Sequence, residues 1–422
     1  MRLYLLTNLP EYDDGGRALE VEGDLWRLRP YDLNEVTADS LKFICISYSW
    51  GLGREPSPFH DDFEVSDRTI PALIAVVRLR PACRHIWVDA FCVPLGPERS
   101  HTLESMGYIY SEACEVIAVL SPNILPSLTY MRENKKLDEP HMFALEEDEW
   151  VTRAWTYQEA VNAKCLHITC EGSGHIIISG QDFLDYLGYR LDHLPVRPLE
   201  RRVRYPRLDA LEDLVDYLTA AYKERSALQV MAKMDRRSHG RPEDHFYAMI
   251  GAISSRLASS TGAVSACEAF MLICERKGDF SFIYSAAPRT TEPGRRWRPV
   301  PGDLPAVLQW DCAGAGEPGR MIEGGGLLLE KVVKLGLGGL SAEADKFTRD
   351  WLGLIGQLPE VDTPAHLRAQ VFYALRLMGF TGTGGSHATA IGLFSPVSHV
   401  SQKDIDHVLV SFSLRWVFGS PA

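Results

Sequence analysis

The chain has 422 residues, of which 45% are hydrophobic and 24% are charged, a composition typical of soluble globular proteins. Because this length exceeds what one ordinary hydrophobic core can organise, we expect two domains. The formal net charge of −12 argues against an extended nucleic-acid-binding surface, since duplex binding depends on cationic neutralisation of phosphates.

The sequence also gives no sign of a membrane-spanning or secretory segment. No apolar run is long enough to cross a bilayer, and residues 1–10 lack the apolar core of a signal peptide. The nine cysteines are scattered and odd in number, as is usual for reduced thiols. We therefore expect a cytoplasmic protein that does not associate with membranes.

Short apolar runs that stop at polar residues predict the strands of the first half of the chain. Leu25–Leu33 is expected to be an edge strand. Buried strands are expected at Phe43–Tyr48, Ile86–Val88 and Val116–Leu120, with helices between them at Thr69–Leu79 and Glu98–Ala113. Strands that alternate with helices pair in parallel, so the pattern predicts an α/β domain with a mostly parallel sheet flanked by helices.

A polar insertion, a helix and further strands follow. The insertion spans Pro122–Trp150 and ends in the acidic run Glu146–Glu149, which we expect to be exposed beside the positive amino end of the next helix. That helix is predicted over Thr152–Ala163, and Cys165–Thr169 and Ile176–Ile178 are expected to add strands.

The basic segment Arg197–Arg207 marks the expected domain boundary, because blocks of like charge are usually solvated linkers. We therefore divide the chain into an α/β domain, residues 1–195, and a second region, residues 196–422. The second region is expected to begin with helices, one over Leu208–Met234 and one over Asp244–Ala252, and to continue as a mixed α+β domain.

Turn and polar residues follow the ends of the predicted parallel strands. Tyr48, Ser49, Trp50 and Gly51 form the turn after the first, and Asp89 follows the second. Ligands of open α/β sheets bind just outside the carboxyl ends of the strands, so these residues are candidates for ligand contact. Trp50 is suited either to stacking on a base or to core packing, and Asp89 either to ligand contact or to capping a helix.

The helix after the insertion carries a second group of candidates. Trp155 and Glu159 lie four residues apart and share a helical face, while Arg153 lies on another part of the same turn. A carboxylate near the start of a helix beside the sheet edge is well placed to act on a bound ligand. The residues alone favour the alternative, in which Glu159 pairs with an arginine.

Three segments of the first domain resemble the motifs of the heterokaryon-incompatibility (HET) family. Phe43–Gly51 (FICISYSWG) resembles "LSYxWG", His85–Cys92 (HIWVDAFC) resembles "IWIDAICINQ", and Trp150–Ala160 (WVTRAWTYQEA) resembles "WxxRxWxxQE". Val93–Leu95 replaces the "INQ" part, so any role of that Asn/Gln pair is absent here. Further on, Arg236–Gly251 resembles the family element "DPRDKIYALLGL" more loosely.

HET domains in turn resemble the TIR (Toll/interleukin-1 receptor) fold, which implies a flavodoxin-like sheet. Ile46–Tyr48 resembles the TIR strand "FISY", and Val116–Asn123 resembles the strand ending "VLSPN". In TIR enzymes that cleave NAD, the catalytic glutamate stands four residues after a tryptophan, which is the spacing of Trp155 and Glu159. The insertion before Trp150 departs from the TIR pattern.

The resemblance implies an NAD-consuming immune or cell-death effector in which Glu159 is catalytic. NAD or a related nucleotide would be the substrate, with no separate cofactor. The residues that would bind it are Tyr48, Ser49, Trp50, Gly51, Asp89, Phe91, Arg153 and Trp155. Cleavage of the ribose–nicotinamide bond passes through an oxocarbenium-like state, which a fixed carboxylate stabilises.

The alternative hypothesis is a non-catalytic HET/TIR-like signalling module that acts by regulated self-assembly or partner binding. Under either hypothesis we expect a homo-oligomer or an activating protein partner. The second domain is expected to restrain the first domain or to sense a trigger. Other chemistry has weak support. Cysteine and histidine spacings give no closed zinc site, no nucleophile elbow is present, and the glycine-rich Thr381–His387 is expected to be a mobile loop.

Overall fold

The computed structural model describes residues 2–9, 16–32, 41–196, 201, 203–218, 225–254, 257, 263–285, 287–305, 316–330, 332–336, 407–411 and 416–419. Thr381–His387 lies outside them. The chain divides into two compact units. The first comprises Met1–Val196, Arg201–Thr219 and Arg237–Ser259, and the second comprises Arg197–Glu200, Ala220–Arg236 and Ser260–Ala422. No helix among the described residues combines the length and apolar character needed to span a bilayer.

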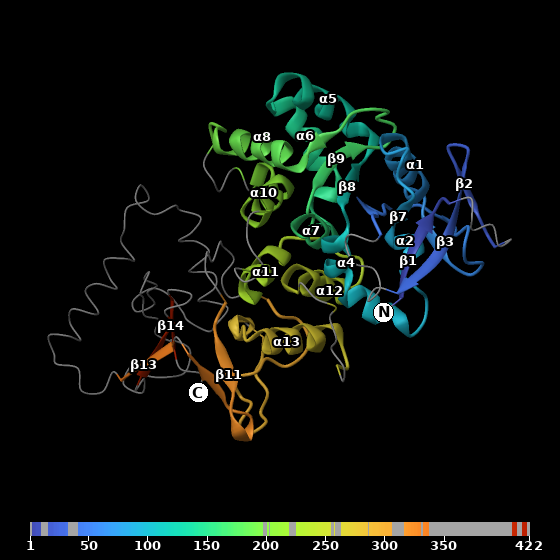
Figure 1. The fold of residues 1–422 in the computed structure, drawn as a ribbon. Coiled ribbons are helices and arrows are strands. Elements are labelled where there is room, and N and C mark those ends of the chain that lie inside the picture. Colours follow the sequence, from blue (N-terminus) through green and yellow to red (C-terminus); the bar gives the residue numbers. More distant parts are fainter. Residues whose placement is uncertain are drawn as a thin grey trace. The chain divides into compact units, whose positions relative to one another are not determined.

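An eight-stranded sheet lies at the centre of the described part of the first unit (Figure 1), in the order β10-β9-β8-β4-β7-β1-β3-β2. The strands are β1 (Arg2–Thr7), β2 (Leu19–Val21), β3 (Asp24–Asp32), β4 (Ile44–Tyr48), β7 (His85–Trp87), β8 (Glu115–Leu120), β9 (Leu166–Cys170) and β10 (Ile178–Ser179). Strands β7, β4, β8 and β9 are parallel, whereas β10 at one side and β1, β3 and β2 at the other pair antiparallel. The sheet is therefore mixed, and the prediction of a mostly parallel sheet holds only for its centre.

The antiparallel side contains strands that apolar runs did not indicate. Strand β1 inserts between β7 and β3, where Leu6 lies opposite both Ile86 and Leu28. Strand β3 is not at the edge as predicted, because β2 pairs with it through a tight turn. Positive φ angles at Glu22 (54°) and Gly23 (85°) give that turn the twist that a two-residue hairpin requires.

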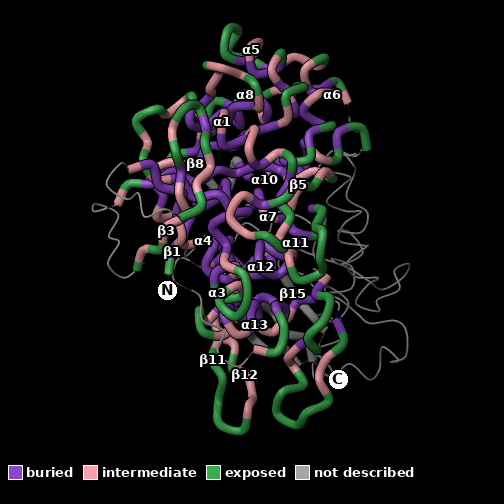
Figure 2. The backbone as a smooth tube through the Cα atoms, turned by 90° about the vertical axis from the view of Figure 1, so that its right-hand side faces the viewer, coloured by how far each residue is buried: buried purple, intermediate pink, exposed green. Residues whose placement is uncertain are grey.

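Helices cover both faces of the parallel centre. They are α1 (Thr69–Leu79), α2 (Asp89–Cys92), α3 (Glu98–Glu104), α4 (Met106–Glu112), α5 (Leu125–Asn134), α6 (Glu139–Glu147), α7 (Ala154–Val161), α8 (Gly180–Asp192), α10 (Pro206–Leu218) and α12 (Pro242–Ile253). Successive residues of a strand point to opposite faces. The hydroxyl of Tyr48 bonds to Thr69 on α1, while Ser47 bonds to Glu159 on α7, so α1 and α7 cover opposite faces. Burial on both faces explains the continuous apolar runs of β4 and β8. Figure 2 shows β8 within the buried interior.

Helices α4, α7 and α12 meet at a glycine junction. A Cβ atom on Gly107 would lie 2.1 Å from the carbonyl oxygen of Gly251, so the two backbones pack at a distance that only glycine permits. Asn162 of α7 donates its side-chain amide to the same Gly251 carbonyl at 2.8 Å. Helix α12 starts with Pro242 at its first position, and the Asp244 carboxylate accepts the N–H of Arg241.

Two predictions about charged segments hold only in part in the described residues. Glu147 and Glu149 of the acidic run are exposed as expected, as is Arg204 of the basic segment. In the acidic run, Glu146 and Asp148 are buried rather than exposed, and Glu146 accepts the N–H groups of Arg207 and Leu208 at the start of α10. The basic segment is not a solvated linker where it is described, since Tyr205 is fully buried and Arg201 pairs with Asp209 at 3.0 Å. Both segments are instead part of the packing between the insertion helices and α10.

The second unit contains helices and short antiparallel strands. Its described elements are α11 (Ala227–Met234), α13 (Ala266–Lys277), β11 (Gly319–Met321), β12 (Leu327–Leu329), β13 (Val332–Gly336), β14 (His407–Ser411) and β15 (Trp416–Gly419). The helix predicted over Leu208–Met234 is thus two helices, α10 and α11, and Ser226 caps the second by accepting the N–H of Gln229. The buried Asp279 carboxylate links this unit by accepting N–H groups from Ala227 and Glu317.

Candidate functional site

The strand order places a topological switch point between β4 and β8. Among the parallel strands, β4 comes first in the chain and is followed by β7, which lies on one side of it. The chain then crosses back, so that β8 lies on the other side of β4. In open α/β sheets, ligands bind outside the carboxyl ends of the strands at such a point. The residues at this edge are therefore the first candidates for a functional site.

Glu159 of α7 lies against this edge, joined to β4. The hydroxyl of Ser47 donates to Glu159 Oε2 at 2.5 Å, and Ser47 in turn accepts the indole N–H of Trp150 at 2.7 Å. Ser47 and Trp150 are 1% exposed and Glu159 is 3% exposed. The partner of Glu159 is thus a serine hydroxyl and not the arginine that we considered from the sequence.

The environment of Glu159 favours its neutral form. Burial, followed by the like charge of Asp89, raises the pKa of Glu159 from 4.5 to about 8. The hydrogen bond from Ser47 and the positive charge of Arg153 act in the opposite direction, because both stabilise the ionised carboxylate. A perturbed carboxyl group at a sheet's switch point is a candidate catalytic group.

Asp89 is the second carboxylate at this edge. Its Oδ2 accepts the indole N–H of Trp50 at 2.8 Å, and its Oδ1 accepts the N–H of Ala90 at 2.7 Å. Burial raises the pKa of Asp89, while the bonds from Trp50 and Ala90 lower it. The Trp50 ring is held edge-on to a carboxylate and carries the Arg54 guanidinium 5.6 Å from its centroid.

Arg153 supplies a cation close to both carboxylates. Its charge lowers the pKa of Glu159, of Asp89 and of the buried Tyr48 phenol, which places the guanidinium among these three groups. The side chain is partly exposed and makes no hydrogen bond or ion pair within the described part of the chain. A partly exposed guanidinium that has no hydrogen-bonded partner in the described residues can bind an anionic group of a ligand.

Two predicted site residues make ring contacts with other parts of the protein. The Trp155 ring stacks on Tyr247 of α12 with centroids 6.3 Å apart. Burial raises the pKa of Asp244, and the nearby Trp155 indole acts to lower it. Phe91 is buried and packs edge-to-face on Phe59. Their contacts in this structure are with the protein's own helices and loops.

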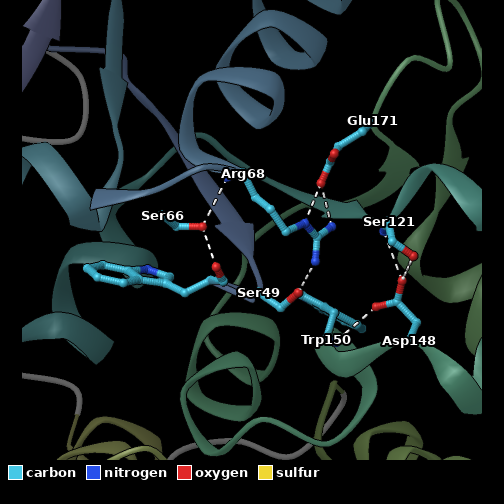
Figure 3. A network of polar contacts seen from close by, with 8 residues as sticks. Ser49, Ser66, Arg68, Ser121, Asp148, Trp150 and Glu171 are labelled. Atoms are coloured by element: carbon cyan, nitrogen blue, oxygen red, sulfur yellow. Dashed lines mark hydrogen bonds and ion pairs between the residues drawn. The ribbon is translucent and has the colours of Figure 1, made fainter. Parts of the chain in front are cut away.

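Ser49 belongs to a polar network that extends along the carboxyl edge (Figure 3). The Arg68 guanidinium donates to Ser49 Oγ and pairs with Glu171 at 2.5 Å, so it joins the ends of β4 and β9. Gly51 has φ +59°, and a Cβ there would lie 3.3 Å from Arg68 Cδ. The turn after β4 is therefore fixed by Arg68.

Asp148 holds the segment that precedes α7. Its carboxylate accepts the N–H and the hydroxyl of Ser121, which follows β8, and also the N–H of Trp150 at 2.9 Å (Figure 3). Trp150 is thus fixed to the end of β8, and its indole reaches Ser47 on β4. This chain of bonds determines where Glu159 lies relative to the sheet.

Sequence reasoning missed Ser47, Trp150, Arg68, Asp148 and Glu171 as members of this edge. Signals existed for two of them. Glu171 is the polar residue that ends β9, just as Asp89 follows β7, and Ser47 is the polar residue inside an otherwise apolar strand. Arg68 and Asp148 lie in loops with no local pattern, so only the tertiary structure assigns them.

Comparison with known families identifies part of this unit. Residues 43–144 match the family model of the heterokaryon incompatibility protein (HET). This stretch of the chain is similar to a HET domain. The HET match includes β4, β7 and β8 with Asp89, whereas α7 with Glu159 lies beyond it. No curated protein and no solved structure gives a significant match.

Proposed function

We propose that this HET-like domain cleaves the ribose–nicotinamide bond of NAD with Glu159 as the catalytic carboxylate, in a process related to heterokaryon incompatibility and cell death. The observation that supports the proposal best is the position of Glu159. It lies beside Asp89 at the carboxyl edge of the parallel strands, next to the switch point at which α/β sheets bind ligands. The choice of NAD as the substrate rests on the resemblance of residues 46–48 and 116–123 to TIR strands.

The reaction requires a carboxylate and no strong acid. The nicotinamide ring is cationic in NAD and leaves as a neutral molecule, while positive charge develops on the ribose. An ionised Glu159 would stabilise that charge. Although burial raises the pKa of Glu159 to about 8, a bound cationic ring favours the ionised form, so substrate itself would prepare the catalytic group.

The neighbouring groups have complementary roles in this proposal. Asp89 accepts one hydrogen bond at each oxygen, and a carboxylate has capacity for further donors such as ribose hydroxyls. Arg153 would bind the pyrophosphate through its unpaired guanidinium. Trp50 would present its ring to the nicotinamide or adenine base.

An NAD-depletion assay on the purified full-length chain tests the proposal. Glu159→Gln keeps the size of the side chain and its ability to accept from Ser47, but it removes the charge. We expect turnover to fall by ~10²–10³-fold. Glu149→Gln, which changes an exposed glutamate before α7, serves as the matched control and should retain wild-type turnover. Equal NAD cleavage by wild type and Glu159→Gln would refute the assignment.

A specific observation supports the alternative of a non-catalytic signalling module. Glu159 is only 3% exposed, and its bond to Ser47 ties α7 to β4, a purely structural use of a buried carboxylate. Under this alternative no NAD is consumed, and Glu159→Gln alters stability or assembly alone. The same assay therefore separates the two functions.

A further inference from the structure

Ser47 stands between Glu159 and the rest of the carboxyl edge, and its hydrogen bonds have a fixed direction. The indole N–H of Trp150 can only donate, so Ser47 Oγ must accept there. A hydroxyl has one proton, and that proton is then free to point at Glu159 Oε2, 2.5 Å away. Ser47 is therefore oriented as a donor to the carboxylate before any ligand binds.

We propose that Ser47 is a positioning residue for Glu159, holding the carboxylate at the sheet edge and favouring its ionised form, with Trp150 fixing the direction of the hydroxyl. The inference rests on the proposed function, because it assigns Ser47 a part in that reaction. Ser47 acts through Glu159 and needs no contact with substrate.

The supports of Trp150 make the arrangement rigid. Asp148 accepts the Trp150 N–H at 2.9 Å, and the hydroxyl of Thr156 on α7 donates to the Trp150 carbonyl at 2.8 Å. Trp150 is thus attached both to the end of β8 and to the helix that carries Glu159. Trp150 also bonds to Ser47, and Ser47 bonds to Glu159, so the carboxylate has little freedom to leave its position.

Ser47 is the group best placed to adjust the protonation of Glu159. The titratable and charged groups that face Glu159 are Asp89, Arg153, Tyr110 and Cys45. Burial raises the pKa of Cys45 and Tyr110 well above their ordinary values, so both stay neutral below pH 9. Among these described groups, Asp89 is the other carboxyl group, and its charge acts on Glu159.

The pH dependence of NAD turnover tests the proposal. In Ser47→Ala the ionised carboxylate loses a donor, and we expect the acid limb of kcat to move up by about one pH unit or more. Ser47→Thr, which restores a hydroxyl, should move the limb back. Thr169→Val, which removes a buried strand hydroxyl that bonds only to Ser173 and Ile176, is the matched control and should leave the limb unchanged. An unmoved limb in Ser47→Ala, or an equal movement in Thr169→Val, would overturn the inference.

A second measurement does not depend on activity. Melting temperature against pH, compared with the same curve in a Glu159→Gln background, reports the titration of Glu159 together with its coupling to Asp89. Ser47→Ala should move that titration upward, and should add no pH-dependent change once Glu159 is Gln. If NAD is not cleaved at all, the proposed function fails while this curve still decides the role of Ser47. Should Ser47→Ala not fold, Ser47→Cys, of similar size and with a weaker donor, replaces it in both measurements with the same expected direction.

Discussion

At the scale of single residues, the burial of Glu159 couples its protonation to folding. Its pKa of about 8 in the folded chain lies above the ordinary value of 4.5, so the native state binds more protons than the unfolded state between these values. Stability should therefore fall as the pH rises through this window. Below it both states are protonated, and above it the native state carries the full cost of a buried charge.

We expect Glu159→Gln to remove this dependence. The Gln variant should gain melting temperature relative to wild type as the pH rises from about 5 to about 8, and the difference should level off above that. Differential scanning fluorimetry over a pH series measures it. Burial also raises the pKa of Asp89, which is present in both proteins. Because the charge of Asp89 acts on Glu159, the difference reports the titration of Glu159 together with its coupling to Asp89. A difference that is flat across the whole series would show that Glu159 is not titrating in this range.

Asp89 gives a second residue-scale prediction. Asp89→Ala removes a hydrogen-bonding carboxylate from the proposed ribose position, so NAD cleavage should fall by about tenfold or more. The melting temperature should change little, because Val88 and not Asp89 is the N-cap of α2 and the Trp50 indole is partly exposed to water. Asp89→Asn keeps an acceptor for Trp50 and separates loss of that bond from loss of charge. A large stability loss with unchanged activity would remove Asp89 from the site.

The limits of sequence reasoning at this scale follow from partners that are distant in the chain. The spacing of Glu159 predicted a helical face, and the polar stop at Asp89 predicted the sheet edge. The partner of Glu159 could not be predicted, because Ser47 lies 112 residues earlier and reaches it only when β4 packs on α7. Trp155 shares the α7 helix with Glu159 but stacks on Tyr247 of α12, a helix that no local pattern connects with α7.

At the scale of elements, the glycine junction of α4, α7 and α12 supports the helix that carries Glu159. A Cβ on Gly251 would lie 1.4 Å from Gln158 Oε1 and 3.2 Å from the Gly107 nitrogen. Gly251→Ala should therefore lower the free energy of unfolding by ~1–3 kcal/mol, because overpacking forces neighbouring groups apart. Gly302→Ala, where a Cβ meets nothing within 4 Å, is the control and should melt near wild type.

Adding Gln158→Ala to Gly251→Ala should recover part of the loss. The Gln158 amide makes no hydrogen bond within the described residues, so its truncation removes the steric conflict without breaking a bond. Such a coupling is measured by a double-mutant cycle on thermal or urea unfolding. Additive effects of the two substitutions would show that the junction does not work through this contact.

The elements themselves differ in how far the sequence predicts them. Strands β4, β7 and β8 and helix α1 were predicted because both faces of the strands are buried, which makes their apolar runs continuous. Strand β1 was not predicted, although Leu3 and Leu5 alternate with Arg2 and Tyr4 as in a half-buried strand. Its place in the sheet depends on pairing with β7, almost eighty residues away in the chain. Helices α5 and α6 were not predicted, because their segment is polar and the residues that they bury are set by contacts with β9 and α10.

At the scale of the whole molecule, a resting protein of low activity is the expected state. With a pKa of about 8, Glu159 is ionised in roughly one molecule in ten at pH 7, and its carboxylate is almost fully buried. Under the proposed function, an unrestrained NAD-cleaving enzyme would also be toxic to its host. Self-association, or a protein partner, that exposes this edge of the sheet would make Glu159 more accessible to substrate. It would also increase the fraction of Glu159 that is ionised.

We therefore expect the purified chain to cleave NAD weakly when dilute and faster when self-associated or bound to a partner. The net charge of −12 opposes nonspecific association, so the active assembly should have a defined size. Mass photometry beside NAD turnover over a concentration series measures both quantities in one sample. Specific activity should rise with the assembled fraction and be abolished by Glu159→Gln at every concentration. A strictly monomeric chain whose specific activity is high at every concentration would exclude this form of control, because catalysis would then need nothing that a single chain lacks.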